Sequence, residues 1–234
     1  MSYQAPFADA ATSIDPTNMD NTFISYYSYG EVLGLALDLS LRNLKGTYTL
    51  DDFMKSVWGK FGKTEIPYTV TDLKASLADY VNVDFSNEFF DRYIYMSELP
   101  DYEKLLSTVG ISYSQIAPNR AYMGADFNNS EGGVVISDYT TIGAPAYKAG
   151  LEKGDIISSI DGMLIATTDD LKVALDQMIP DKEIAIKYKR LDETRMCKLV
   201  LDKNPRIQTR LYEDSGLKPD ADQLKRRAGW LHAR

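Results

Sequence analysis

The spacing of apolar residues divides the chain near residue 120. Before that point apolar side chains return every three or four positions, which is typical of helices that bury one face. The pattern predicts helices over residues 22–42 and 102–109, and further helices that begin near Leu50, Thr71 and Ser86. Because residues 22–42 carry so few polar side chains, we expect that helix to be buried on most sides.

After residue 120, short apolar runs alternate with turn residues, a pattern that indicates strands. The predicted strands and turns are residues 134–136, residues 156–157, the turn Asp161-Gly162, and a hairpin of residues 183–188 and 196–201 across residues 191–194. One helix, over residues 168–178, interrupts this region, and residues 220–230 predict another in the polar tail. The region therefore has the pattern of a small β domain with one or two helices.

These patterns predict a multidomain protein of the α and α+β classes. We expect a helical part over residues 1–117, a strand-rich domain over residues 118–203 and a tail over residues 204–234. The dipeptide Pro118-Asn119 falls where the helical period changes to the strand period, so the first boundary is placed there.

Charge and rare residues exclude several kinds of site. The formal net charge of -8 argues against a nucleic-acid partner. We expect no membrane partner, since no apolar run reaches the length of a membrane span, and the first 20 residues do not resemble a signal peptide. A single cysteine, Cys197, excludes an internal disulfide, and a single histidine, His232, excludes a zinc site with two histidines. We therefore expect neither a metal site nor another cofactor in this chain.

The stretch AYKAGLEKGDIISSIDG at residues 146–162 resembles the signature of PDZ domains that are fused to bacterial proteases. The resemblance covers roughly residues 119–203 and implies a fold that is similar to a β-barrel. A PDZ fold captures an extended peptide as an added strand and holds its terminal carboxylate with backbone amides. A peptide or protein C-terminus is therefore an expected partner.

The resemblance also places the residues of this groove. Tyr122, Met123, Gly124 and Ala125 match the carboxylate-binding loop, and Leu171 and Leu175 would line the opposite wall. The sequence departs from the family pattern, because Ala125 is small where a larger apolar residue is usual and the acid Asp126 follows. Two hypotheses stay open, a working peptide groove and an internal spacer.

The helical part resembles the end of the catalytic domain in the M61 family of zinc metallopeptidases, the glycyl aminopeptidase group. The segments that carry this resemblance are residues 7–11, 15–18, 21–30, 37–42, 50–54 and 85–93, and the closing segment 223–231. In that family a PDZ domain follows the helical part and a similar segment ends the chain. The resemblance implies the helical C-terminal half of a thermolysin-like catalytic domain, in a parent enzyme that removes small N-terminal residues such as Gly or Ala.

Such an enzyme holds zinc with a His-Glu-x-x-His helix and a further glutamate, and the chain contains no such motif. We therefore expect a C-terminal fragment that begins after the zinc ligands and is inactive alone. Zinc and the missing N-terminal part would belong to the parent enzyme, which the resemblance suggests is bacterial and either periplasmic or exported.

Tyr27 is the one candidate catalytic residue. In the M61 family and its relatives, a tyrosine three residues before a glycine at the start of a helix donates a hydrogen bond to the oxyanion of the reaction intermediate. Tyr27 stands in that position before Gly30. The alternative is that Tyr26, Tyr27 and Tyr29 are aromatic wedges between helices.

Other motifs are given structural roles. The acids in Asp51-Asp52, Asp72 and Asp169-Asp170 are expected to be helix caps. The basic run at residues 225–227 is expected to be a solvated helix face, and Trp230 with Leu231 an anchor that packs on an unidentified surface. For function, the leading hypothesis is the peptidase fragment, and the alternative is a non-catalytic peptide-binding protein that uses the PDZ groove.

Overall fold

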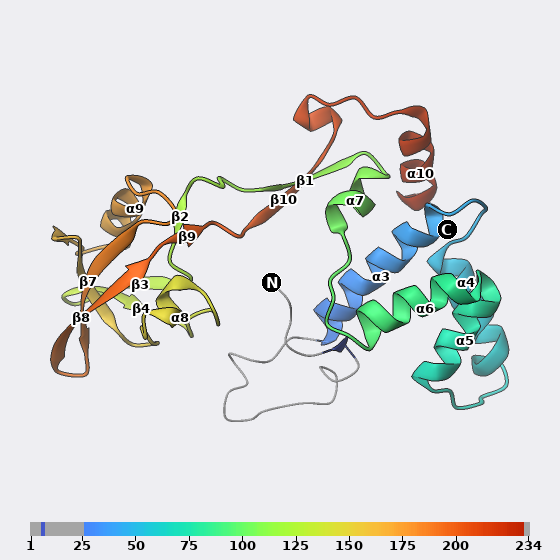
Figure 1. Cartoon of the computed structure of the whole chain (residues 1–234), viewed down its shortest axis with the longest axis horizontal. Coiled ribbons are helices and arrows are strands. Elements are labelled where there is room, and N and C mark those ends of the chain that lie inside the picture. The colour runs from blue at the N-terminus through green and yellow to red at the C-terminus, as the bar shows by residue number, and fades with distance from the viewer. Residues whose placement is uncertain (1–5, 8–25, 232–234) are drawn as a thin grey trace. The chain divides into compact units, whose positions relative to one another are not determined.

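The computed structural model describes residues 6–7 and 26–231 (Figure 1). Their contacts form two compact units: residues 26–114 together with 209–231, called here the helical unit, and residues 115–208, called the β-rich unit. The first residues of the helix predicted over 22–42 lie outside the described part. No helix in the described ranges is long and apolar enough to cross a membrane.

The N-terminal part of the helical unit consists of helices, coloured blue to green in Figure 1. They are α3 (Tyr26–Arg42), α4 (Leu50–Val57), the π-helical turn η1 (Trp58–Gly62), α5 (Val70–Tyr80), α6 (Val83–Phe89), the π-helical turn η2 (Phe90–Ile94) and α7 (Tyr102–Ser107). The second half of α3 is buried on most sides, as predicted. Its first half buries mainly Tyr29 and Leu33.

Helix α5 begins one residue before its predicted start at Thr71 because Thr69 caps it. The hydroxyl of Thr69 accepts a hydrogen bond from the backbone N–H of Asp72 at 3.2 Å, and the Asp72 carboxylate accepts one from the backbone N–H of Thr69 at 2.8 Å. This reciprocal pair is a capping box. Asp72 thus helps to start the helix, but the cap itself is a threonine.

The same correction applies to the other acids that were predicted as caps. Thr49 caps α4 with Asp52 in the first turn, and Thr167 caps the later helix α9 (Thr168–Asp176) with Asp170 as its capping-box partner. A threonine satisfies the free N–H groups of the first turn in each case, and the acids add negative charge at the positive end of the helix.

The predicted helix start at Ser86 is wrong. Asn82 caps α6 by accepting a hydrogen bond from the N–H of Phe85 at 2.9 Å, so the helix begins at Val83. Ser86 is buried inside the helix, where its hydroxyl donates to the carbonyl of Lys74 at 2.6 Å. Ser86 therefore joins α6 to α5 instead of starting a helix.

Buried residues of the helical unit fall into three clusters. The largest lies between α3, α4, α5 and α6 and contains Leu41, Phe53, Leu77 and Phe89. Two smaller clusters are centred on Tyr29 with Leu33 and on Leu39 with Leu106 and Val109. The smaller clusters lie on other faces of α3, so this helix contributes side chains to all three.

The β-rich unit is built on an antiparallel sheet in the order β3-β4-β5-β7-β8, with β6 paired to β5. The strands are β3 (Phe127–Ser130), β4 (Gly133–Ile136), β5 (Ile156–Ile160), β6 (Met163–Leu164), β7 (Glu183–Arg190) and β8 (Glu193–Val200), and a separate pair joins β2 (Ala121–Tyr122) to β9 (Asp202–Lys203). The short helix α8 (Pro145–Lys148) and helix α9 complete the unit. Its buried apolar residues, apart from Ala144, form one cluster.

Two turns of this sheet differ in how well the sequence predicts them. Asp161 and Gly162 both have positive φ (49° and 81°), as the predicted tight turn requires. The hairpin turn consists of Leu191-Asp192 alone, so the predicted loop over residues 191–194 is too long. Leu191 has φ of 55°, a conformation that leucine rarely adopts, and its sequence carries no turn signal.

The C-terminal segment returns to the helical unit. Strand β10 (Ile207–Leu211) pairs with β1 (Ile111–Gln115), and after the 3-10 turn η3 (Glu213–Ser215) comes helix α10 (Ala221–Leu231). Trp230 packs against the cluster of Leu39, Leu106 and Val109. The anchor predicted at Trp230 thus lies on the helical unit, whereas Leu231 is 64% exposed.

The prediction that residues 225–227 form a solvated face is wrong for two of the three. Arg226 Nε donates to the carbonyl of Thr108 at 2.8 Å, and Arg227 pairs with Glu213. Gln223 Nε2 also donates to the carbonyl of Ser107 at 2.8 Å. Gln223 and Arg226 thus bind carbonyl groups at the C-terminal end of α7 that have no partner within that helix.

Candidate functional site

Strand β3 forms an edge of the main sheet, so one side of its backbone has no strand partner in the described structure. The N–H of Ser137 donates to the carbonyl of Asp126 at 2.9 Å, and Asn128 pairs with Val135 on β4. Because backbone groups alternate along an antiparallel ladder, those of Phe127 and Asn129 point to the open side. This edge is therefore available for an added strand.

The loop before β3 turns at Gly124, which has φ of 81°. A Cβ atom there would lie 2.2 Å from the Cβ of Ala144, so only glycine fits. The carbonyl of Met123 accepts from the N–H of Ala146 at 2.7 Å, and that of Gly124 from Thr141 at 3.0 Å. Both carbonyls of the turn therefore accept hydrogen bonds from residues 141–146.

The amide groups of this loop are placed differently from its carbonyls. Within the described residues, no acceptor is recorded for the backbone N–H groups of Met123, Gly124 and Ala125. Three successive N–H groups in a turn form a concavity that suits an anion such as a carboxylate. Tyr122 precedes them in β2, where it pairs with Asp202.

Leu171 and Leu175, the residues predicted for the opposite wall, both lie in helix α9. Leu171 is only 4% exposed and Met123 only 2%, so both belong to the core of the unit. Ala125 and Leu175 pack against the same cluster but remain partly exposed. The structure thus brings these four predicted residues into one cluster, and Ala125 with Leu175 are the ones that a ligand could touch.

Helix α9 is tied to the neighbouring strands at both ends. At its N-terminal end, Asn129 Oδ1 accepts a hydrogen bond from the N–H of Thr168 at 2.7 Å. At its C-terminal end, Arg120 Nε lies 2.8 Å from Asp176 Oδ1. The sequence analysis placed a helix start at Thr168 but predicted neither contact, because the partners are far apart in the chain.

Tyr27 lies in the first turn of α3 and is 74% exposed. Tyr29, by contrast, is 2% exposed and packs edge-on against Phe7, with ring centroids 5.2 Å apart. Tyr29 therefore fits the description of an aromatic wedge, and Tyr27 does not within the described residues. The phenol of Tyr27 is reachable from outside the unit, next to Gly30.

The described residues do not fit a zinc ion. They contain no group of three or more His, Cys, Asp or Glu side chains that could hold a metal. Cys197 is half-buried on β8, and burial raises the pKa of its thiol, which disfavours the thiolate that metals bind. His232 lies outside the described residues.

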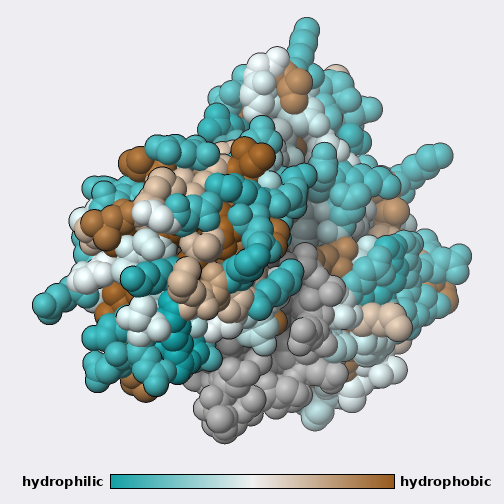
Figure 2. Space-filling view, turned by 60° about the vertical axis from the view of Figure 1, so that its left-hand side comes forward, coloured by the Kyte–Doolittle hydropathy of each residue, from teal (hydrophilic) through white to brown (hydrophobic). Residues whose placement is uncertain are grey.

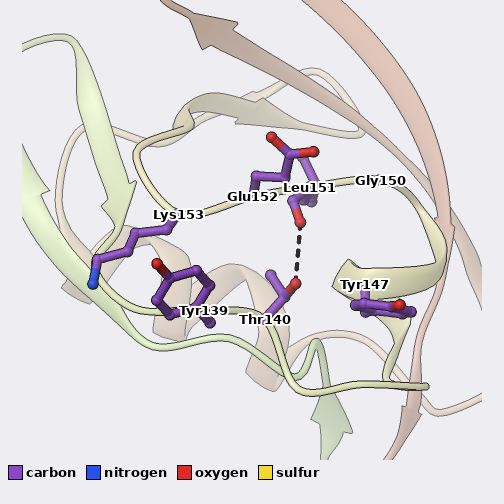
Figure 3. A pocket seen from close by; sticks show the side chains of 7 residues that line it. All are labelled: Tyr139, Thr140, Tyr147, Gly150, Leu151, Glu152 and Lys153. Atoms are coloured by element: carbon purple, nitrogen blue, oxygen red, sulfur yellow. Dashed lines mark hydrogen bonds between the residues drawn. The ribbon is translucent and has the colours of Figure 1, made fainter. Parts of the chain in front are cut away.

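A separate concavity of about 430 Å3 lies elsewhere on the β-rich unit (Figure 3). It is lined by Tyr139, Thr140, Tyr147, Gly150, Leu151, Glu152 and Lys153. The hydroxyl of Thr140 donates to the carbonyl of Leu151 at 3.2 Å, and Lys153 Nζ lies 4.8 Å from the centre of the Tyr139 ring. None of the predicted groove residues lines it, and Lys153 already occupies one face of Tyr139.

Comparison with known proteins identifies the β-rich unit. Residues 121–201 match the PDZ domain family, so the chain contains a PDZ domain. Solved structures that match part of the chain include the HtrA-type protease AlgW with decapeptide (TM-score 0.35, 19% identity, 38% of this chain and 30% of that chain). A serine endoprotease from Yersinia pestis matches with TM-score 0.33 and 17% identity, over 37% of this chain and 30% of that one.

One solved structure matches nearly the whole chain. It is an aminopeptidase N family protein from Idiomarina loihiensis, with TM-score 0.72 and 29% identity. The match covers 92% of this chain but only 37% of that chain, so this chain spans well under half of its structural neighbour. No curated protein matches the sequence.

Proposed function

We propose that this chain is the C-terminal part of an M61-type zinc aminopeptidase, which removes small N-terminal residues such as Gly or Ala from peptides. The observation that carries the proposal is the structural match to an aminopeptidase N family protein over 92% of this chain. That match includes both units, so it is more specific than a match to a PDZ domain alone.

In this proposal the zinc ligands come from a part of the enzyme that precedes these residues. The described side chains offer no ligand set for zinc, so no chemical step is assigned to a metal here. The contribution of this chain to catalysis is then a hydrogen-bond donor, and Tyr27 is the residue that fits.

Tyr27 would donate its phenol hydrogen to the oxyanion that forms when water attacks the peptide carbonyl. Its exposure at the start of α3 supports this role, since a donor must reach a substrate outside its own unit. A phenol donates without carrying charge, and removal of one such donor typically costs about 100- to 1,000-fold in kcat.

The test is Tyr27→Phe in an active enzyme that contains this chain. We expect kcat to fall by about 100-fold or more with little change in KM, because the bond forms mainly in the transition state. Tyr29→Phe is the matched control, since its ring is buried. Equal losses in the two variants, or no loss in Tyr27→Phe, would show that Tyr27 is not the donor.

A second function has its own support. Three features support peptide binding: the open edge of β3, the amides of residues 123–125, and the partly exposed Ala125 and Leu175. We therefore infer that the PDZ domain binds peptides that end in a free carboxylate and an apolar residue. The spacer hypothesis predicts no such binding.

The second test is a titration with an acetylated peptide that ends in Ala-Val-Leu, as the free acid and as the C-terminal amide. The free acid is expected to bind. The peptide with an amidated C-terminus should not bind, because it lacks the negative charge that the N–H groups of the loop attract. Equal binding of the two forms, or none at millimolar peptide, would support the spacer hypothesis.

A further inference from the structure

The hydrogen bond between Asn129 and Thr168 joins the middle of β3 to the first residue of α9. The two residues are 39 positions apart in the sequence, and Asn129 belongs to the edge strand described above. Thr168 is at a helix start, where an N–H group has no partner within the helix. Asn129 supplies that partner from the strand.

The side chain of Asn129 is directed to the same side as those of Ala125 and Phe127. Side chains alternate along a strand, and both Ala125 and Phe127 pack against the cluster that contains Leu171 of α9. Asn129 is exposed, but its amide oxygen reaches α9 at 2.7 Å. A side-chain hydrogen bond therefore connects β3 to α9 at Asn129, and we call this bond the bridge. No such bond exists at Ala125, whose side chain has no polar atom.

A peptide added to β3 meets this bridge at a definite position. This step rests on the peptide binding proposed above. With the carboxylate at the amides of residues 123–125, antiparallel pairing puts the last residue beside Ala125 and the third-last beside Phe127. The fifth-last residue then lies beside Asn129, where the side chain bridges to α9.

We propose that Asn129 limits the length of peptide that the groove accepts. Because the fifth-last residue lies beside Asn129, the last four residues fit between the loop and the bridge. A longer peptide that continues along β3 must first break the bond to Thr168 and leave a helix-end N–H without its acceptor. Extra residues therefore bring little gain in affinity, and Asn129 is a specificity-determining residue for short C-terminal segments.

The test measures binding of two acetylated peptides to the full chain by fluorescence anisotropy or calorimetry. One is the tripeptide Ala-Val-Leu, and the other is an octapeptide with the same three C-terminal residues preceded by five alanines. Asn129→Ala removes the acceptor, and Asn129→Ser replaces it with a hydroxyl on a side chain too short to reach the N–H of Thr168. Asn129→Asp keeps an acceptor at the helix start, and Asn128→Ala changes the neighbour on the other face of β3.

In the native chain the two peptides are expected to bind within about twofold of each other. In Asn129→Ala and Asn129→Ser the octapeptide should gain about fivefold or more, since the bond no longer has to be broken, while the tripeptide is unchanged. Asn129→Asp and Asn128→Ala should behave as the native chain does. Faster hydrogen exchange at the Thr168 amide in Asn129→Ala and Asn129→Ser, but not in Asn129→Asp or Asn128→Ala, would confirm that the bond forms in solution.

Other outcomes would overturn the inference in distinguishable ways. An octapeptide that binds the native chain tenfold more tightly than the tripeptide would show that the bridge imposes no limit, although the groove binds peptides. If the folded Asn129→Ala and Asn129→Ser variants bind the octapeptide no more tightly than the native chain does, the bridge likewise imposes no limit on peptide length. Failure of both peptides to bind every variant would reject the proposed peptide binding itself, and the length limit with it.

Discussion

The two units differ in how their cores are closed. The core of the β-rich unit is one cluster formed by residues 121–201, a continuous stretch of chain. The helical unit has three clusters, and one of them is completed by Trp230, which follows the entire PDZ domain in the sequence. The β-rich unit is therefore built from local sequence, whereas the helical unit depends on a distant segment.

This difference explains how each unit is recognised. Residues 121–201 match a family model, the PDZ domain, whereas the comparison that includes the helical unit is a match to a solved structure. A continuous domain keeps its turn residues in fixed order, as in the Gly154-Asp155 turn before β5. A unit assembled from two ends of the chain leaves a weaker pattern in any single stretch.

Core truncation is expected to have the largest effect on this comparison. Ile186 in β7 and Leu77 in α5 are both fully buried. Ile186→Ala and Leu77→Ala should each cost about 2–5 kcal/mol of unfolding free energy in their own unit. Calorimetry of the full chain should show each variant lowering one transition only. If either variant lowers both transitions equally, the units do not unfold independently.

A glycine pair in the β-rich unit separates steric strain from backbone strain. Gly124 and Gly132 both have positive φ, but a Cβ at Gly124 meets Ala144 at 2.2 Å and one at Gly132 meets nothing within 4 Å. Gly124→Ala should cost about 2–4 kcal/mol and weaken peptide binding, and Gly132→Ala about 1 kcal/mol. Equal costs in chemical denaturation would mean that the turn at Gly124 relaxes freely.

The dependence of the helical unit on the tail is tested at Trp230. Trp230→Ala should lower the free energy of unfolding of the helical unit by about 2 kcal/mol, because a half-buried ring leaves the cluster of Leu39 and Leu106. Leu231→Ala is the control, since its side chain is mostly exposed, and it should cost less than about 0.5 kcal/mol. A Trp230→Ala variant as stable as Leu231→Ala would show that the tail is not needed.

The smallest expected effects concern how the free energy of unfolding changes at low pH. Each unit contains a capping box whose aspartate contributes to this change. The hydroxyl of Thr69 chiefly lowers the pKa of Asp72, and that of Thr167 lowers the pKa of Asp170, each from an ordinary value of 3.8. A lowered pKa means that the carboxylate stabilises the fold above about pH 4, and that this stabilisation is lost as pH falls through the folded-state pKa.

Asp72→Asn and Asp170→Asn should therefore each destabilise their own unit at pH 7, and the difference from the native chain should shrink below pH 4. Thermal unfolding between pH 7 and pH 2.5 measures this. A difference that stays constant over the whole range would mean that the carboxylate charge is not involved.

Local sequence patterns predicted most helices and several turns, but they predicted the helix boundaries less accurately. The helical period gave α3 and α9, and the turn at Asp161-Gly162 followed from its residue types. The start of α6 was misplaced because both Asn82 and Ser86 are good capping residues, and only tertiary packing buries Ser86.

Contacts between distant residues could not be predicted. The binding of Arg226 to the end of α7 joins residues 118 positions apart, and a basic run in a polar tail gives no sign of it. Resemblance to the PDZ family drew attention to Gly124, but nothing in the sequence distinguished Asn129 from other polar residues. Its bond to Thr168 depends on how β3 and α9 meet in the folded domain.

The proposal that these residues belong to a longer zinc aminopeptidase is tested most directly by the coding DNA ahead of the Met1 codon. The reading frame is expected to continue upstream and to encode a His-Glu-x-x-His motif followed by a further glutamate. An in-frame stop codon with a ribosome-binding site directly before Met1 would contradict the proposal and favour a non-catalytic, peptide-binding protein.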